Sequence, residues 1–324
     1  MMIPEMTESL VSIIIPCFNS EATIRTTLDN CLQQTHSNIE VLVIDDQSTD
    51  ASYSIVLRIA RSESRVVLIA NETKGVQNAR NLGLDHAQGE FIKFLDSDDL
   101  MELDLIEKQV LLLRDSPVSV VKSNWAKFSD DLSASRPEIQ PCDKPYSNPA
   151  DFLAELWNGN MYPPHAWLVP RLLMTTDLKW NTDLSQNQDG EFFARAISRA
   201  RDVKHCNATA YYRQPIGEDQ NISQRTGEDA IKSQIKTLRN YKTIVDGFQP
   251  HLAVMRAYNQ QVFNIAYRAT NSVSEKKFLD DVLSLMTDAE VSHINIPSYP
   301  LRFLTRTLGV RKSLQIRRWI KCGF

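Results

Sequence analysis

Short apolar runs rich in β-branched residues alternate with amphipathic stretches over the first hundred residues of the chain. Four such runs occur, at residues 11–16, 39–46, 65–71 and 89–99. Three segments with apolar residues at helical spacing separate them, at 19–34, 48–59 and 75–86. Runs of this length, bounded by turn-forming residues, are typical of buried strands. Strands and helices alternating in this order predict βαβ units, an α/β fold with a mostly parallel sheet flanked by helices.

Polar residues gather where each predicted strand ends, in the clusters PCFNSE, DDQSTD, NETKG and DSDD. The carboxyl ends of parallel strands meet at one edge of the sheet, and ligands of such sheets bind there. We therefore expect the four clusters to form one site.

The cluster DSDD places three carboxylates, those of Asp96, Asp98 and Asp99, within four positions behind an apolar run. Their charges repel one another, so the cluster suggests a positively charged partner. Taken alone, a solvated loop or a helix cap is the more common explanation. The alternative is a hard divalent cation, since oxygen ligands suit Mg²⁺ or Mn²⁺ and these ions often bind substrate phosphates.

Composition is ordinary for a soluble globular protein, with 42% apolar and 23% charged residues among 324. The net charge of −4 predicts no nucleic-acid partner. Five cysteines without metal-ligand spacing suit reduced thiols. The start MMIPEMTESL lacks the basic residues of a signal peptide, and no apolar run approaches the roughly 18 residues that span a bilayer. We therefore expect a cytoplasmic protein.

The second half of the chain differs in character. Residues 132–149 are rich in Ser, Pro and Asn, which indicates an irregular connection. Short helices are expected at 151–157 and 188–199. Beyond Tyr212 the pattern is helical, with segments at 230–245, 252–270 and 275–286.

The tail of the chain is basic. No acidic residue follows Glu290, whereas the tail contains Arg302, Arg306, Arg311, Lys312, Arg317, Arg318 and Lys321. Together with Trp319, Ile320 and Phe324, these residues could form a peripheral contact with the anionic inner face of a membrane. A solvated terminal helix that docks on the body of the protein is the alternative.

Four segments together resemble the inverting family 2 glycosyltransferases of the GT-A fold. They are SIIIPCFNSEATI, VLVIDDQSTDAS, NETKGVQNARNLGLDHAQGEFIKFLDSDD and QNQDGEFFARAI. A D-x-D pair alone is a weak signal, but the ordered set in its strand context is specific. The resemblance covers about residues 10–215 and implies a GT-A catalytic domain over 1–215, with a nucleotide-sugar half at about 10–130 and an acceptor half at about 131–215. Residues 216–324 then form a helical C-terminal region with the basic tail.

The resemblance implies a nucleotide site at the strand ends. The residues it places there are Pro16, Phe18, Asn19, Glu21, Asp46, Lys74, Asn78, Arg80 and Asp96. Asp46 would accept a hydrogen bond from the imide of the base, and Gly75 would allow close approach of the backbone. Two structural alternatives remain open: Asn19 or Ser20 as a helix N-cap, and Arg80 as a partner for a sheet-end aspartate.

The resemblance also implies a metal site that holds Mn²⁺ or Mg²⁺. Asp98 is the expected metal ligand, and Asp96 is expected at a ribose hydroxyl or a metal-bound water. Asp99 is expected to cap a helix that begins near Leu100. A divalent metal would screen the charge of the departing nucleotide diphosphate.

An inverting transfer needs a base that takes the proton from the acceptor hydroxyl. Asp189 matches the family's base position, with Gln188 where the family has glutamate, and Glu191 is a weaker candidate. His165 and Trp167 could line the acceptor pocket, although a packed structural role is more common for such a histidine. Arg213 is a candidate diphosphate contact beside a polar stretch that could close as a lid.

These residues imply a metal-dependent inverting enzyme that moves a sugar from a nucleotide-diphosphate donor, expected to be a UDP-sugar, to a hydroxyl of a glycan or lipid-linked glycan. The alternative is a catalytically inactive nucleotide-sugar-binding or scaffold protein, which loss of the D-x-D pair or of the base would favour. A nucleotidyltransferase or a nicotinamide oxidoreductase would need a glycine-rich loop after the first strand, and PCFNSEAT contains no glycine.

Overall fold

The computed structural model describes residues 9–129, 131–214, 227–270 and 278–287, with short pieces at 294–296, 309–310 and 312–314. The chain divides into two compact units, each assembled from segments distant in the sequence. Unit 1 comprises residues 1–147, 162–182 and 199–218, and unit 2 comprises 148–161, 183–198 and 219–324. Two short helical segments upstream of residue 215 thus group with the C-terminal helices.

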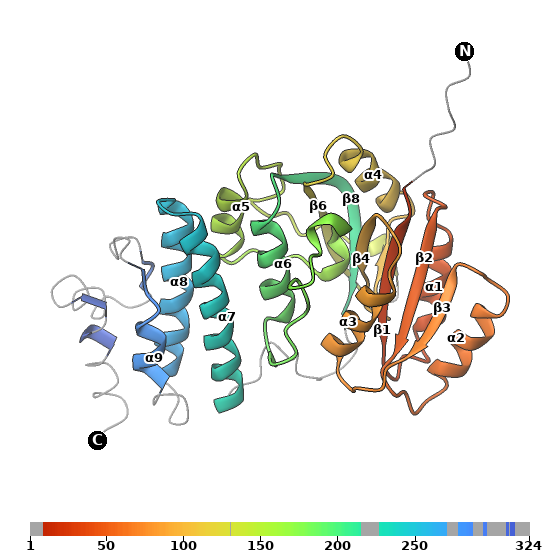
Figure 1. The fold of residues 1–324 in the computed structure, drawn as a ribbon, viewed down its shortest axis with the longest axis horizontal. Coiled ribbons are helices and arrows are strands. Elements are labelled where there is room, and N and C mark those ends of the chain that lie inside the picture. The colour runs from red at the N-terminus through yellow and green to blue at the C-terminus, as the bar shows by residue number, and fades with distance from the viewer. Residues whose placement is uncertain are drawn as a thin grey trace, which may run out of the picture. The chain divides into compact units, whose positions relative to one another are not determined.

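Unit 1 begins with the predicted βαβ units. The parallel strands are β1 (Val11–Cys17), β2 (Ile39–Asp45), β3 (Val66–Ala70) and β4 (Phe91–Phe94), in the spatial order β3-β2-β1-β4. Their connecting helices are α1 (Ile24–Leu32), α2 (Ser52–Ala60) and α3 (Val76–His86) (Figure 1). Every residue of β1 is buried, as its apolar run predicts. A Cβ on Gly83 of α3 would collide with Ile14, so this glycine lets α3 pack closely on β1.

The same sheet continues past β4 with strands of mixed direction. The described strands form one eight-stranded sheet of order β3-β2-β1-β4-β7-β6-β8-β5. The added strands are β5 (Leu100–Met101), β6 (Val120–Phe128), β7 (Trp167–Pro170) and β8 (Val203–Arg213). β7 runs antiparallel to β4 and to β6, β8 is parallel to β6, and β5 pairs antiparallel with β8. Most of the segment at 132–149 is irregular, as predicted.

The prediction that Asp99 caps a helix near Leu100 is wrong. Leu100 and Met101 form β5, where Leu100 pairs with Tyr211, and the helix α4 (Leu105–Leu113) begins five residues later. The long strand β8 offers a partner for this short segment, so sheet pairing determines its conformation.

Lys93, in the middle of β4, is a fully buried cation. Its Nζ donates to Gln109 Oε1 at 2.8 Å, to the carbonyl oxygen of His165 at 2.8 Å and to that of Trp167 at 3.1 Å. Burial lowers the pKa of Lys93 to about 7. Three carbonyl oxygens nevertheless require three N–H donors, which favours the ammonium form. Lys93 therefore ties β4 to α4 and to the start of β7.

We expect Lys93→Met to lower the free energy of unfolding by about 3 kcal/mol, because three buried acceptors lose their donor at once. Urea denaturation measures this loss. Lys127→Met is the matched control: the Lys127 side chain on β6 is 48% exposed beside Glu138, and exposed pairs contribute about 1 kcal/mol or less. Equal losses in the two variants would contradict the role of Lys93.

Unit 2 is helical in its described part. Its helices are α5 (Pro149–Leu156), α6 (Gln188–Ser198), α7 (Glu228–Gly247), α8 (Leu252–Ala269) and α9 (Leu279–Leu283). α7 and α8 lie side by side (Figure 1), close to the ranges that periodicity predicts. The Asn148 side chain caps α5 by accepting from the N–H of Ala150. Between α5 and α7, the ring of Trp157 stacks on that of Tyr241, with centroids 4.4 Å apart.

No described helix is long and apolar enough to cross a membrane. Of the basic residues in the tail, Lys312 alone belongs to the described residues, where it is exposed. The predicted membrane contact of the tail therefore lies otherwise outside the part of the chain that the structure describes.

Candidate functional site

The loops after β1 and β2 are joined by side chains from the two polar clusters. Asn19 adopts a φ of 48°, and its Oδ1 accepts from the N–H of Thr49 at 2.8 Å. The carboxylate of Glu21 accepts from the N–H of Ala51 at 2.8 Å. Pro16 lies in β1, in register with Ile44 of β2. Asn19 thus fixes the neighbouring loop, and α1 begins after Thr23 without a side-chain cap.

Asp46 follows β2 directly and joins the carboxyl-end edge of the sheet to the start of α3. Its Oδ1 accepts from Asn71 Nδ2 at 2.7 Å and from the N–H of Gly75 at 2.9 Å. Gly75 has a φ of 130°, which a residue with a Cβ rarely adopts, and so the turn into α3 requires glycine. A carboxylate has about four acceptor positions, so these bonds leave Asp46 with capacity for another donor.

Phe18 and Lys74 lie together at the surface of this edge. Phe18 is 45% exposed, and the Lys74 Nζ lies 4.4 Å from the centroid of its ring. The side chain of Asn78 donates to the carbonyl oxygen of Lys74 at 3.1 Å. An exposed aromatic face with a cation above it could stack on a nucleotide base while the cation faces phosphate.

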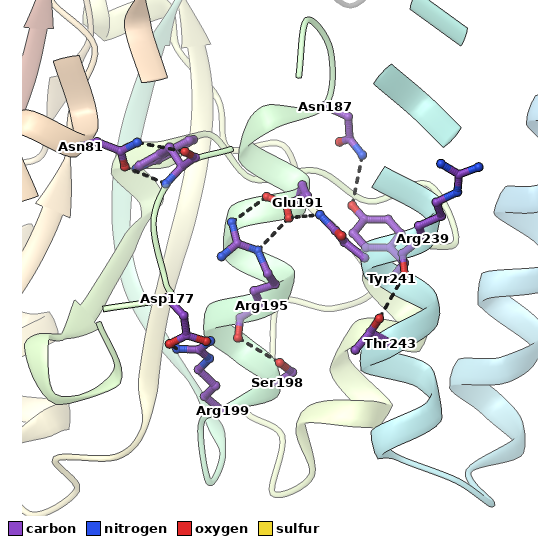
Figure 2. Close-up of polar contacts among 12 residues, drawn as sticks. Asn81, Asp177, Asn187, Glu191, Arg195, Ser198, Arg199, Arg239, Tyr241 and Thr243 are labelled. Carbon is purple, nitrogen blue, oxygen red and sulfur yellow. Dashed lines mark hydrogen bonds and ion pairs between the residues drawn. The ribbon is translucent and has the colours of Figure 1, made fainter. Parts of the chain in front are cut away.

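Arg80 on α3 pairs with Asp96, and this arrangement is the structural alternative that the sequence left open. The Arg80 side chain is only 4% exposed, and its guanidinium donates to Asp96 Oδ1 at 2.7 Å. It also lies over the ring of Trp180, 4.2 Å from the centroid. Asn81 holds Trp180 through two hydrogen bonds to its backbone (Figure 2). Arg80 therefore has a fixed position from which it orients Asp96.

The loop DSDD rests on α1. The hydroxyl groups of Thr23 and Thr27 both donate to the carbonyl oxygen of Ser97, at 3.0 and 3.1 Å, and the hydroxyls of Ser20 and Ser97 lie 2.7 Å apart. We did not predict this support. The spacing of the two threonines, one helical turn apart, is the signal that could have revealed it.

Asp99 is buried and faces His165 and Arg213. Its Oδ2 lies 3.1 Å from His165 Nδ1, and its Oδ1 accepts from the N–H of Arg213 at 2.7 Å. Burial raises the pKa of Asp99, and the His165 charge opposes this shift. His165 is fully buried, and so is Trp167, which packs edge-on against Tyr162.

Arg213, at the end of β8, fixes the backbone of the aspartate loop. Its Nε donates to the carbonyl oxygen of Asp98 at 2.8 Å, and its guanidinium lies over the ring of Phe128. The polar stretch that follows Gln214 and was predicted as a lid lies outside the described residues up to residue 226.

The pKa of Asp98, like that of Asp99, is raised above its ordinary value. Burial, followed by the charges of Asp99 and Asp96, raises the pKa of Asp98 to about 7. A divalent cation would relieve this repulsion, so the chemistry of the residue fits a metal ligand. The described residues contain no group of three or more His, Cys, Asp or Glu side chains able to hold a metal. A cation at Asp98 would therefore complete its coordination with diphosphate oxygens and water, as Mg²⁺ commonly does.

Asp189 and Glu191 lie in the first turn of α6, in unit 2, and their surroundings differ. Glu191 is 1% exposed and accepts two hydrogen bonds from Arg195, at 2.7 and 2.8 Å (Figure 2). Asn240 of α7 donates to the same carboxylate at 2.6 Å. Glu191 thus forms a buried ion pair with Arg195 that has a structural role in unit 2. Asp189, in contrast, is half-buried.

The family model of glycosyl transferase family 2 matches residues 12–174. This match spans half of the chain, which belongs to glycosyl transferase family 2, as the resemblance implied.

Two relatives illustrate the range of similarity. A glycosyltransferase of Haemophilus influenzae that is described as uncharacterized is 40% identical over 167 residues, which cover 51% of this chain and 64% of the relative. The Escherichia coli UDP-Glc:alpha-D-GlcNAc-diphosphoundecaprenol beta-1,3-glucosyltransferase WfgD is 41% identical over 121 residues, covering 37% of this chain and 47% of the relative. The match therefore spans less than two thirds of either relative.

Solved structures confirm the fold class. Staphylococcus aureus TarS 1–349 in complex with UDP-GlcNAc matches with a TM-score of 0.72 at 18% identity, covering 97% of this chain and 92% of TarS 1–349. The mannosyltransferase PcManGT of Pyrobaculum calidifontis, in complex with GDP-Man and Mn²⁺, matches with a TM-score of 0.55 at 18% identity, covering 96% and 86%. At these identities the likeness concerns the fold alone, and it bears out the predicted GT-A class with a helical C-terminal region.

Proposed function

We propose that the chain is a metal-dependent inverting glycosyltransferase that moves a sugar from a UDP-sugar to a hydroxyl of a lipid-linked glycan. The observation that supports this most directly is the loop DSDD at the end of β4. There the pKa of Asp98 is raised to about 7 beside two further carboxylates, at the sheet edge where ligands of α/β sheets bind. Family membership supports sugar transfer as the reaction.

The donor half of the proposal concerns unit 1. Phe18 and Lys74 offer an aromatic face and a cation for the nucleotide, and Asp46 retains acceptor capacity for the imide of uracil. Asp96, which Arg80 orients, is assigned to a ribose hydroxyl or a metal-bound water. We assign Asp98 as the ligand for Mn²⁺ or Mg²⁺, which when bound screens the charge of the leaving diphosphate.

Asp189 is proposed as the general base. The acceptor oxygen forms a bond to the anomeric carbon while the bond from that carbon to the donor phosphate breaks. The acceptor proton passes to the carboxylate of Asp189, and UDP leaves with the electron pair of the broken bond. Attack from the face opposite the leaving group inverts the anomeric configuration.

The lipid-linked acceptor is supported by the relatives. WfgD is named for an undecaprenol diphosphate acceptor and a UDP-glucose donor, and a second Escherichia coli relative, WfaP, is named for the same pair. An acceptor of this kind would suit a cytoplasmic enzyme that contacts the inner face of a membrane through its basic tail.

Binding of the donor is tested by thermal unfolding with UDP-glucose, UDP-GlcNAc or GDP-mannose, each with Mn²⁺ or with EDTA. A ligand at 100 times its dissociation constant stabilises by about 2.7 kcal/mol, which for a chain of this size raises Tm by about 4 °C. We expect this shift for a UDP-sugar with Mn²⁺ only. Equal Tm shifts in EDTA would contradict the proposed metal dependence. A UDP-sugar that binds but is not turned over to release UDP would favour an inactive binding protein.

A further inference from the structure

The segment that leads into α6 and carries Asp189 is held by α7. The Ser233 hydroxyl on α7 accepts from the N–H of Ser185 at 3.1 Å and from that of Gln186 at 3.0 Å. Next to it, Gln234 Nε2 donates to the side-chain oxygen of Gln186 at 2.8 Å. Ser233 and Gln186 are both buried. The backbone just before the helix is therefore fixed from α7.

A second contact fixes the first turn of α6. Asn187 adopts a φ of 54°, and its Nδ2 donates to the Tyr241 hydroxyl at 3.1 Å (Figure 2). A Cβ on Gly190 would collide with Asn187 Oδ1 and would lie 3.0 Å from the Tyr241 hydroxyl. With Asn187 and Tyr241 where they lie, position 190, next to Asp189, has no room for a Cβ unless the Asn187 side chain shifts.

Tyr241 is itself rigidly placed. Its ring is buried and stacks on Trp157 at an interplanar angle of 26°. Burial raises the pKa of Tyr241, so the hydroxyl stays protonated at neutral pH. Two residues after Asp189, in the same first turn of α6, Glu191 accepts a hydrogen bond from Asn240 of α7. α7 thus contacts the chain on both sides of Asp189.

We propose that α7 positions the carboxylate of Asp189, with Tyr241 and Asn187 as positioning residues. The inference rests on the proposed role of Asp189 as general base. A base must lie within hydrogen-bond reach of the proton it removes, and a displacement of about 1 Å can cost roughly 100-fold in rate. The C-terminal helical region then supplies part of the catalytic geometry.

Two variants remove the same hydrogen bond from its two sides. Tyr241→Phe keeps the stacked ring, and Asn187→Gly suits a φ of 54°. UDP release is measured with UDP-glucose, Mn²⁺ and GlcNAc-diphosphoundecaprenol. We expect kcat to fall by about 10-fold or more in each variant, with the donor KM and the affinity for UDP unchanged. The double variant should lose no more than either single variant, because both act on one contact.

Hydrogen exchange tests the placement without any substrate. Amides of the segment 184–191 should exchange faster in Tyr241→Phe and in Asn187→Gly than in the wild type. Thr243→Ala is the matched control on α7: Thr243 is exposed, and its hydroxyl donates to the carbonyl oxygen of Arg239 in its own helix (Figure 2). This control should change neither exchange nor kcat.

Asp189→Asn, measured in parallel, separates the two proposals. If Asp189→Asn is inactive while both positioning variants keep wild-type turnover and exchange, the positioning role is wrong and the base stands. If Asp189→Asn keeps full turnover, the base assignment fails and the positioning role fails with it. A drop in kcat that comes with lost UDP affinity or a much lower Tm would show a general structural role and overturn the inference.

Discussion

Asp189→Asn is expected to lower glycosyl transfer by about 100- to 10,000-fold, the range that a general base contributes. The amide has nearly the shape of the carboxylate but cannot take the proton from the acceptor hydroxyl. Because Asp189 is half-buried on the first turn of α6, the substitution should leave Tm and the affinity for UDP with Mn²⁺ nearly unchanged. Initial rates of UDP release and calorimetric titration with UDP measure the two quantities.

Glu191→Gln is the informative comparison for this variant. It removes the charge from a buried ion pair with Arg195, and breaking such a pair costs about 3 kcal/mol or more. We therefore expect Glu191→Gln to lower stability more than Asp189→Asn does, and Asp189→Asn to lower turnover more. Full turnover of Asp189→Asn together with an inactive but folded Glu191→Gln would reverse the assignment.

Asp98→Asn is expected to stabilise the protein in the absence of metal while it abolishes metal-dependent binding of UDP. The folded-state pKa of Asp98, about 7, lies above its ordinary value of 3.8. The stabilisation that protonated Asp98 contributes is therefore complete below about pH 4 and is lost as the pH rises through 7. At pH 8 the variant avoids a half-buried charge beside two other carboxylates and should be more stable by about 2 kcal/mol. The difference should vanish near pH 4.

The same pKa governs binding of the metal in the wild type. A proton and a cation compete for Asp98, so the affinity for UDP with Mn²⁺ should fall as the pH drops below 7. Urea denaturation in EDTA at pH 4 and pH 8, together with UDP titrations across this range, measures both effects. Asp85→Asn is the matched control, since Asp85 is exposed on α3 and pairs only at the surface with Lys179. If Asp98→Asn were less stable than the wild type at pH 8, the proposed charge repulsion among Asp96, Asp98 and Asp99 would be wrong.

Much of unit 1 follows from local pattern. The apolar runs before residue 99 became β1 to β4 because buried parallel strands need continuous apolar residues, and turn-forming residues bound them. The edge that collects Asn19, Asp46 and Asp96 follows from the direction of these strands. Lys93 could not be recognised as a core residue, because its three acceptors come from α4 and from the segment at 165–167.

Local sequence pattern does not predict which distant segments pair with each other. Leu100 joined a strand and did not start a helix, because Tyr211, more than a hundred residues later, offered a ladder partner. Arg80 carries the same charge whether it faces phosphate or Asp96, so only the fold could show that it pairs with Asp96. The hydrogen bond between Asn187 and Tyr241 joins residues 54 positions apart, and no periodic pattern in the sequence indicates it.

The chain leaves unit 1 after residue 147, returns at 162, leaves again at 182 and returns at 199 before its final helices. α5 and α6 therefore pack on α7 and α8, which follow much later in the sequence. A protein cut after residue 215 would keep every motif of the family and yet lose the partners of the helix that carries Asp189. The apolar faces of α5 and α6 would then be exposed and prone to aggregation, and a chain that keeps them covered extends through α8.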